Sequence, residues 1–392
     1  MGALDGLKIL DFSTLLPGPF ATLMLADMGA EVLKISSAGK ADIVADYPPF
    51  IEGTDISASQ AWLGRNKKTM FLNLKTEEGR SIVKELVKEY DIVMEQFRPG
   101  VMDRLGLGYE DLKAVNPAVI YCSLTGYGQS GPLRDAAGHD INYMSRSGII
   151  SHAGRKTEGP SLMNFQIADI AVGSLNSVIG ILAAVNHRRN TGKGQFIDVA
   201  MMDGCVPFNS IDGAAFLVSG RQPAREGERL NGGCIYDFYQ TKDGEYMSVG
   251  SLEPKFWKQF CTAIGREDLI EGSVWPQNIS EVKSEIRGIF KTKTRDEWIE
   301  IFSHYDACVQ PVLDLNEALL CDEQIKAREM VVDVRLPLHE DISVRQLATA
   351  VKLSECPCEY KHAGYPAGYH TREIIDSLGL NYNELEAKGV FK

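Results

Sequence analysis

The sequence has no excess of positive charge and no long apolar run. Its 41 lysines and arginines are outnumbered by 53 aspartates and glutamates, which gives a formal net charge of -12. Because such an acidic chain repels phosphate backbones, we expect no nucleic-acid partner. The most apolar stretch, residues 178–185, is far shorter than the roughly twenty residues that a membrane-spanning helix needs. Without a recognisable signal peptide either, we expect a cytoplasmic protein with no membrane partner.

The eight cysteines have neither the spacing of a disulfide framework nor that of a zinc site. They are scattered through apolar or mixed surroundings, and the closest pair, Cys356 and Cys358, flanks a single proline. We interpret these residues as free thiols, which suit a reducing compartment, and we predict no metal site.

The chain is long enough for two domains, since 392 residues exceed the size at which a single core keeps growing. Apolar runs at residues 7–12 and 31–35 flank a segment with helical spacing, which predicts a β-α-β unit. Further strands are predicted at 69–74, 91–95, 119–124 and 195–199, and further helices at 76–90 and 169–187. This alternation predicts an α/β fold with a parallel sheet in a Rossmann-like large domain.

The composition changes after residue 200. Residues 221–233 are rich in arginine, glutamate and glycine, which is typical of a linker. Next, Asp243-Gly244 predicts a tight hairpin turn, because glycine supplies the positive φ that such turns need. Helical patterns follow at 254–264, 279–292, 294–302 and 371–378, with extended segments at 307–312 and 330–353. We predict a large domain at 1–200, a linker at 201–233, a smaller α+β domain at 234–325, and a return to the large domain at 326–392.

Residues 126–131 fit the glycine pattern of a dinucleotide-binding turn and follow a predicted strand. Pro132 and a polar stretch come next, in place of the apolar helix whose N-terminus would receive a pyrophosphate. We therefore predict no NAD site. The glycines instead permit tight turns in a loop that leads to His139.

Two side chains able to carry a proton stand thirty positions apart, His139 in a glycine-bearing loop and Asp169 at the start of an apolar segment. Removing a weakly acidic proton from carbon demands a positioned base, and inverting that carbon needs an acid on the opposite face. Histidine titrates near neutral pH, and surroundings can tune an aspartate toward it. The pair indicates proton transfer, although Asp169 alone could be a helix cap and His139 a loop histidine bonded to backbone.

Ordered motifs extend along the whole chain. They include Gly6-Leu7-Lys8-Ile9-Leu10-Asp11, Pro17-Gly18-Pro19, residues 25–35, Arg98-Pro99-Gly100-Val101, residues 191–195 and His370-Thr371-Arg372-Glu373. With these motifs the sequence resembles the family III CoA-transferases and their relatives, the α-methylacyl-CoA racemases. The resemblance implies a Rossmann-like large domain, a smaller central domain and an interlocked homodimer.

Three positions favour the racemase branch. By resemblance, the transferases use the aspartate matching Asp169 as a nucleophile and usually have a non-basic residue in place of His139. Racemases instead keep a Gly-His-Asp-x-Asn-Tyr motif, present here as residues 138–143, and an acidic turn matched by Leu252-Glu253-Pro254. The resemblance therefore predicts a racemase that inverts the α-carbon of 2-methylacyl-CoA thioesters by two-base 1,1-proton transfer through an enolate.

The same resemblance assigns roles within the site. His139 and Asp169 alternate as base and acid, while Glu253, from the same or the other subunit, orients the imidazole or shares its proton. Backbone N–H groups near Asp169 are the predicted donors to the enolate oxygen. The substrate pocket is expected to include three further residues of the motif, Asp140, Asn142 and Tyr143. The acyl group stays open among a branched fatty acyl, a sterol side chain and an arylpropionyl group.

The phosphates of CoA require cations, and arginine offers a forked geometry that suits them. The expected phosphate-binding side chains are Lys34, Arg65, Lys67, Lys68, Arg98 and Arg104. After Ile35 the chain has Ser36-Ser37-Ala38-Gly39-Lys40 where many relatives have an arginine-bearing turn, which weakens the case for phosphate contacts from this loop. No cofactor beyond the CoA of the substrate is expected.

Two alternatives to the racemase remain. One is a family III CoA-transferase that moves CoA between carboxylic acids through an Asp169 mixed anhydride and an aspartyl-CoA thioester. The other is a non-catalytic CoA-binding partner, which would neither exchange an α-proton nor transfer CoA. A CoA-sized covalent adduct on the protein distinguishes the transferase from both other possibilities.

Overall fold

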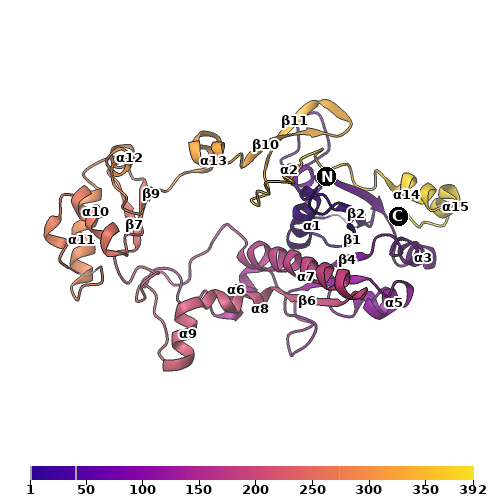
Figure 1. Cartoon of the computed structure of the whole chain (residues 1–392), viewed down its shortest axis with the longest axis horizontal. Coiled ribbons are helices and arrows are strands. Elements are labelled where there is room, and N and C mark those ends of the chain that lie inside the picture. The colour runs from indigo at the N-terminus through magenta and orange to yellow at the C-terminus, as the bar shows by residue number, and fades with distance from the viewer. Residues whose placement is uncertain (1, 40–41, 273) are drawn as a thin grey trace. The chain divides into compact units, whose positions relative to one another are not determined.

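A computed structural model describes residues 2–39, 42–272 and 274–392 (Figure 1). The chain forms two compact units, each assembled from segments far apart in the sequence. The first unit contains the chain up to Ser147, Phe165–Val206 and Glu323–Lys392, and the second contains Gly148–Asn164 and Pro207–Asp322. The predicted boundaries need one correction, because Gly148–Asn164 was assigned to the large domain and belongs to the second unit.

The first unit is built on a six-stranded parallel sheet in the order β3-β2-β1-β4-β5-β6. Its strands are β1 (Lys8–Asp11), β2 (Glu31–Ser36), β3 (Lys67–Phe71), β4 (Ile92–Glu95), β5 (Ile120–Thr125) and β6 (Phe196–Ala200). This is the order of a doubly wound sheet, so the predicted α/β fold is confirmed. The order reverses between β1 and β4, and such a reversal opens a crevice at the carboxyl ends of the strands.

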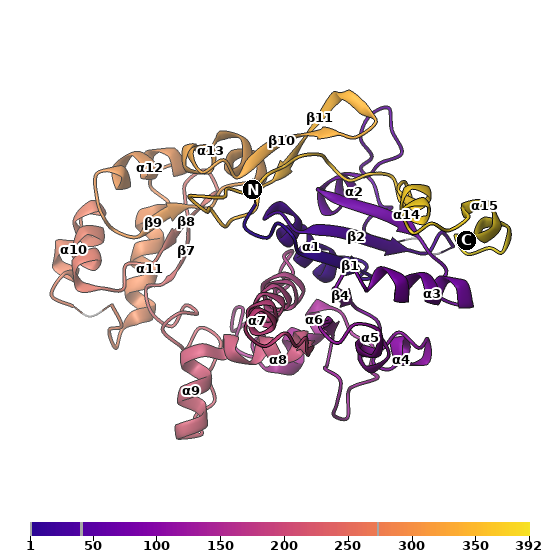
Figure 2. The same ribbon diagram turned by 45° about the vertical axis from the view of Figure 1, so that its right-hand side comes forward.

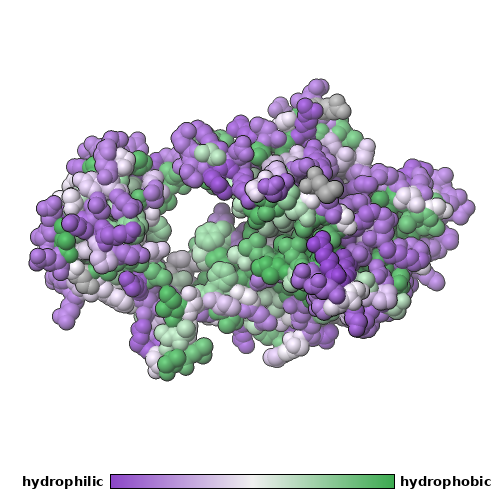
Figure 3. All heavy atoms as spheres, in the orientation of Figure 1, coloured by the Kyte–Doolittle hydropathy of each residue, from purple (hydrophilic) through white to green (hydrophobic). Residues whose placement is uncertain are grey.

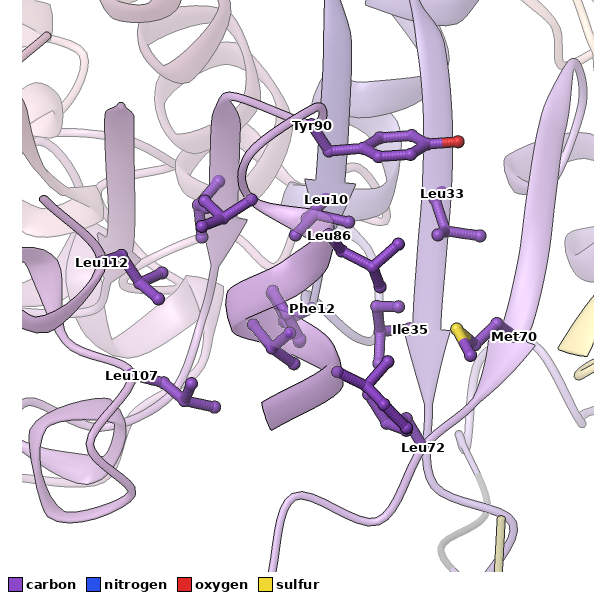
Figure 4. Close-up of a cluster of buried hydrophobic side chains, with 14 of the residues drawn as sticks. Leu10, Phe12, Leu33, Ile35, Met70, Leu72, Leu86, Tyr90, Leu107 and Leu112 are labelled. Carbon is purple, nitrogen blue, oxygen red and sulfur yellow. The ribbon is translucent and has the colours of Figure 1, made fainter. Parts of the chain in front are cut away.

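Helices cover both faces of this sheet (Figure 2). On one face, α3 (Glu77–Leu86) joins β1, β2 and β3 in a buried cluster that includes Leu10, Leu33 and Met70 (Figure 4). On the same face, α5 (Tyr109–Val115) places the Tyr109 ring against Tyr121 of β5 and Phe196 of β6. On the other face, α1 (Pro17–Asp27) and α7 (Leu175–Thr191) contact each other, and α7 also packs against β5 and β6.

The other elements of this unit are shorter. They are α2 (Ala58–Leu63), α4 (Val101–Arg104), α6 (Asp140–Ser147), the π-helix η1 (Ile167–Ser174), α8 (Met201–Cys205), α13 (Glu323–Ala327), the antiparallel pair β10 (Val331–Leu336) and β11 (His339–Leu347), α14 (Thr371–Ser377) and α15 (Tyr382–Ala387). The C-terminal segment returns to the sheet, since α14 packs against β3 and Ile374 and Phe391 join the buried cluster. Together, η1 and α7 are long and apolar enough to cross a membrane, but they pack against α1 and α8 inside the unit.

The second unit has a small antiparallel sheet of β7 (Asp237–Gln240), β8 (Tyr246–Val249) and β9 (Val309–Pro311). Its other elements are η2 (Val206–Asn209), α9 (Ser210–Ser219), α10 (Pro254–Ala263), η3 (Glu267–Leu269), α11 (Ile279–Phe290), α12 (Arg295–Ser303) and η4 (Glu317–Cys321). The Asp243-Gly244 turn joins β7 to β8 as predicted, with Gly244 at φ +89°. The prediction of a linker at 201–233 is wrong for its first part, which contains α8, η2 and the whole of α9.

Arg65 has a structural position that sequence analysis did not anticipate. Its side chain is fully buried and donates to both carboxylate oxygens of Asp27, at 3.0 and 2.5 Å. Its remaining nitrogen donates to the Gln346 side chain and to the Leu347 carbonyl, each at 2.9 Å. Since every guanidinium nitrogen is engaged inside the fold, Arg65 has none left for a phosphate, and that prediction is wrong.

Replacing Arg65 by leucine is expected to destabilise the protein by about 3–5 kcal/mol, because it leaves the Asp27 carboxylate buried without its cation. Urea unfolding followed by circular dichroism measures the change. Lys68→Leu is the matched control, since the exposed Lys68–Glu373 pair contributes less than about 1 kcal/mol. Equal losses in the two variants would contradict the structural role of Arg65.

Candidate active site

A pocket of about 340 Å³ lies at the carboxyl ends of β1, β4 and β5. Both predicted proton carriers, His139 and Asp169, line it together with Tyr143. The remaining lining residues are Leu15, Pro17, Gln96, Phe97, Arg98, Pro99, Leu124, Thr125, Gly126, Tyr127, Arg134, Ala136, Ala137, Gly138 and Met201. Open parallel sheets bind their ligands at this edge, so we call it the reaction pocket.

The residues around His139 fix the loop that carries it. The His139 N–H donates to the Asn142 side chain at 3.0 Å, and the Asn142 N–H donates back to the His139 carbonyl at 2.8 Å. The Tyr143 hydroxyl donates to the Gly138 carbonyl at 2.5 Å, and its buried ring leaves no room for a side chain at Gly138. Of the predicted pocket residues, Tyr143 therefore lines the reaction pocket, whereas Asn142 holds the backbone of the loop.

Asp169 lies in the first turn of η1, whose N-cap residue is Gln166, so Asp169 is not the helix cap. The Asp169 N–H donates to the Asp140 carboxylate at 2.9 Å. This N–H was a predicted donor to the enolate oxygen, and that prediction is wrong because the group is already engaged. Asp140, another predicted pocket residue, thus anchors the start of the π-helix, a local distortion that is frequent at functional sites.

The surroundings of Asp169 raise the pKa of its carboxyl toward neutral pH. Burial, and then the negative charge of Asp140, raise the pKa of Asp169 to about 6, while His139 acts in the opposite direction. At pH 7 most of the carboxylate is ionised, but a minor protonated form is accessible. Asp169 can therefore serve both as a base and as an acid.

The start of α6 supplies free hydrogen-bond donors beside His139. Among the residues that the structure describes, none accepts a hydrogen bond from the backbone N–H of Asp140 or of Ile141. These are the first two residues of an eight-residue helix, and its N-terminus carries a partial positive charge. A negative charge that develops on an oxygen in the reaction pocket would find its donors here.

Asp11 forms a buried charge network at the end of β1. Its carboxylate accepts from the hydroxyls of Ser13 and Thr22, each at 2.5 Å, and lies 3.7 Å from the ammonium groups of Lys34 and Lys67. Burial alone would raise the pKa of Asp11, but the two lysines and the hydroxyls hold it below its ordinary value. Burial also lowers the pKa of Lys67 to about 7.

The predicted phosphate-binding cations line three pockets at this edge of the sheet. A pocket of about 360 Å³ is lined by Lys34, Lys67 and Lys68, the reaction pocket by Arg98, and a third pocket of about 760 Å³ by Arg104. The Lys67 ammonium already donates to Thr22 and to the Pro19 carbonyl, whereas the buried Lys34 ammonium has no hydrogen-bond partner among the described residues. Leu15 lines all three pockets, so they adjoin one another at this residue.

Glu253 lies in the second unit and directly precedes α10, whose first residue is Pro254. Its side chain is exposed and makes no capping hydrogen bond with this helix.

Gln96 and Arg134 are among the residues of the reaction pocket that sequence analysis missed. The Gln96 side chain accepts a hydrogen bond at 3.1 Å from the backbone N–H of Gly18, which belongs to the Pro-Gly-Pro motif at the start of α1. In the sequence, this motif was the one signal that pointed to Gln96, because the Gly18 N–H needs a hydrogen-bond acceptor at the same edge of the sheet.

Comparisons with known proteins identify the family of this chain. The family model for CoA-transferase family III matches residues 4–371. The chain is 34% identical to the human alpha-methylacyl-CoA racemase over 98% of this chain and 95% of the relative. It is also 32% identical to the succinate–glutarate CoA-transferase of Agrobacterium fabrum, over 96% of this chain and 95% of the relative. A crystal structure of a CAIB/BAIF family protein from Brucella suis superposes with a TM-score of 0.84 at 30% identity, covering 96% of this chain and 99% of that one.

The chain therefore belongs to CoA-transferase family III, and the predicted resemblance is confirmed. It is an enzyme of the superfamily that contains both CoA-transferases and α-methylacyl-CoA racemases.

Replacing Asp140 by asparagine is expected to lower the pKa of Asp169, because it removes a neighbouring negative charge while the amide oxygen can still accept the Asp169 N–H. The carboxyl ¹³C chemical shift, followed through a pH titration, measures this pKa. Asp135→Asn removes an exposed charge from the loop before His139 and is the matched control, for which we expect no change. An unchanged pKa in the Asp140 variant would contradict the assigned coupling.

Proposed function

We propose that this enzyme is a 2-methylacyl-CoA racemase that inverts the α-carbon by two-base 1,1-proton transfer. The observation that carries the proposal is the presence of His139 and Asp169 in one pocket, with the pKa of Asp169 raised to about 6. A carboxyl whose pKa is raised in this way can exchange the roles of base and acid with an imidazole in the same pocket.

The proton balance of the reaction follows from these groups. One of the two residues takes the α-proton, and the electron pair of the broken C–H bond moves to the thioester oxygen as an enolate. The free N–H groups of Asp140 and Ile141 hydrogen-bond that oxygen. The other residue then gives its proton to the opposite face of the carbon, so the configuration is inverted and no redox partner is needed.

The CoA part of the substrate is proposed to run along the carboxyl edge of the sheet, with its thioester in the reaction pocket. The pockets that adjoin at Leu15 are lined by Lys34, whose ammonium makes no hydrogen bond among the described residues, and by Arg98 and Arg104. These cations are the proposed phosphate ligands. The role of Glu253 as a partner of the imidazole stays a prediction from the resemblance.

The second candidate is a CoA-transferase. Asp169 lines the pocket, so its carboxylate is also placed to attack a thioester carbonyl. In that reaction the carboxylate oxygen forms a mixed anhydride and expels CoA thiolate, which then attacks the aspartyl carbonyl and releases the acid.

Incubation with a single enantiomer of a 2-methylacyl-CoA in D2O, without an acceptor acid, tests the proposal. We expect α-deuterium and loss of optical purity by NMR, and an unchanged protein mass. His139→Ala should reduce racemisation by at least about 100-fold, because one face of the carbon loses its proton carrier. His152→Ala, a histidine that does not line the reaction pocket, is the control.

Three results would contradict the racemase. They are no exchange together with a CoA-sized protein adduct, unchanged racemisation in the His139 variant, and racemisation that persists in Asp169→Asn. The adduct would support the transferase. The absence of exchange, adduct and transfer would support a non-catalytic CoA-binding protein.

We also propose that the enzyme is a homodimer that uses α9. The helix exposes Ile211, Leu217 and Val218, whose exposed fractions are 70%, 84% and 91%. Figure 3 shows hydrophobic atoms gathered on α9. A single chain leaves this apolar surface in water, whereas a second copy would bury it.

Replacing both Leu217 and Val218 by serine is expected to weaken the dimer by at least roughly tenfold, because about 2 kcal/mol or more of apolar burial is lost. Light scattering during size-exclusion chromatography over a dilution series measures the association. Leu338→Ser removes an exposed leucine from the β10–β11 turn and should leave the association unchanged. A wild-type protein that is monomeric throughout would contradict the proposal.

A further inference from the structure

Two guanidinium groups converge at Gly100, which has φ +77° in the turn before α4. A β-carbon placed on this glycine would lie 3.3 Å from Nη1 of Arg104 and 3.4 Å from Nη2 of Arg134. Arg104 is the last residue of α4, which follows β4, whereas Arg134 lies in the loop between β5 and α6. The backbone at Gly100 thus lies close to both guanidinium groups.

Neither guanidinium is neutralised by a carboxylate in the part of the chain that the structure describes. No carboxylate among the residues that the structure describes forms an ion pair with Arg104 or Arg134, and the same holds for Arg98, two residues before Gly100. By contrast, Arg188 and Arg266 pair with carboxylates at 3.0 and 2.5 Å. Like charges repel, so two guanidinium groups held at one position are suited to an anion that binds both.

The position of the pair indicates which anion. Arg134 lines the reaction pocket and Arg104 lines the third pocket, and the two pockets share Leu15 and Phe97. The third pocket is larger, at about 760 Å³ against about 340 Å³, and its lining includes Lys75, Lys392 and several apolar side chains. A ligand that occupies both pockets must place the part that joins its two ends beside these arginines.

We infer that Arg104 and Arg134 together bind the diphosphate of CoA. This inference rests on the proposed function, and it adds Arg134, which neither the sequence motifs nor the family resemblance singled out. In a CoA thioester the diphosphate joins the pantetheine arm, which carries the reacting thioester, to the adenosine 3′-phosphate. With the thioester at His139, the diphosphate lies at the junction of the two pockets and the adenosine end lies in the larger one.

Calorimetric titration of the full-length enzyme with CoA, 3′-dephospho-CoA and pantetheine tests the assignment. Arg134→Gln should weaken binding of CoA and of 3′-dephospho-CoA by roughly tenfold to a hundredfold, because both contain the diphosphate and lose one charged hydrogen-bond donor. Binding of pantetheine should not change. Arg134→Lys should recover part of the loss, since it restores the charge but not the fork.

Arg328→Gln is the matched control, because it removes an exposed arginine that lines none of the three pockets. Thermal unfolding of each variant excludes a general loss of structure. Unchanged CoA binding in Arg134→Gln would overturn the inference. A loss for CoA but not for 3′-dephospho-CoA would overturn it too, since it would move Arg134 to the 3′-phosphate. An equal loss for pantetheine would place Arg134 in the reaction pocket alone.

The assay separates this inference from the proposed reaction, because binding requires no chemistry. A wild-type enzyme that binds CoA but exchanges no α-proton leaves the Arg134 result intact and refutes only the racemase. A wild-type enzyme that does not bind CoA at all would overturn both.

Discussion

The buried carboxylate of Asp11 is the interaction on which this edge of the sheet depends. Asp11 is the last residue of β1, and its carboxylate attracts the ammonium groups of Lys34 in β2 and Lys67 in β3. It also accepts hydrogen bonds from the hydroxyl of Thr22 in α1 and from that of Ser13, which begins the loop that contains Leu15. Because that loop lines all three pockets, one carboxylate helps to set the shape of the reaction pocket and of both its neighbours. The buried charge network of Asp11, Lys34 and Lys67 thus also supports the residues that line these pockets.

The two neighbouring acidic residues Asp140 and Asp169 have different environments at the reaction pocket. Asp140 accepts backbone hydrogen bonds and holds the start of η1, while the neighbouring Asp169 points into the pocket with its pKa raised. The two carboxylates therefore differ in role: Asp140 positions the backbone, and Asp169 is the one that we propose to move a proton. This division is a recurrent way in which proteins run acid and base chemistry near neutral pH.

Much of the fold could be predicted because its signals are local. Apolar runs predict the strands of the sheet, and the Asp-Gly turn predicts the β7–β8 hairpin. The motif at residues 138–143 predicted His139 as a site residue, and the structure places it in one pocket with Asp169. What the sequence could not provide were the pairings between distant residues.

Arg65 illustrates this limit, because nothing near it in the sequence indicates that Asp27 would pair with it in the core. The segment Gly148–Asn164 is a second case. Arg155 fastens it to the second unit through ion pairs with Glu226 and Asp237, both at 2.8 Å and both more than seventy residues away. Local periodicity contains no information about such contacts, and the same holds for the two arginines at Gly100.

The return of the C-terminal segment has a consequence for how the protein is made. Glu323–Lys392 belongs to the first unit and supplies Ile374 and Phe391 to its core, so the sheet lacks part of its cover while the second unit is being synthesised. Translation adds about 5–20 residues per second. While the second unit and the C-terminal segment are being synthesised, an apolar face of the nascent sheet is exposed to water. Chaperones that recognise exposed apolar segments are therefore expected to hold the nascent chain until its last residues leave the ribosome.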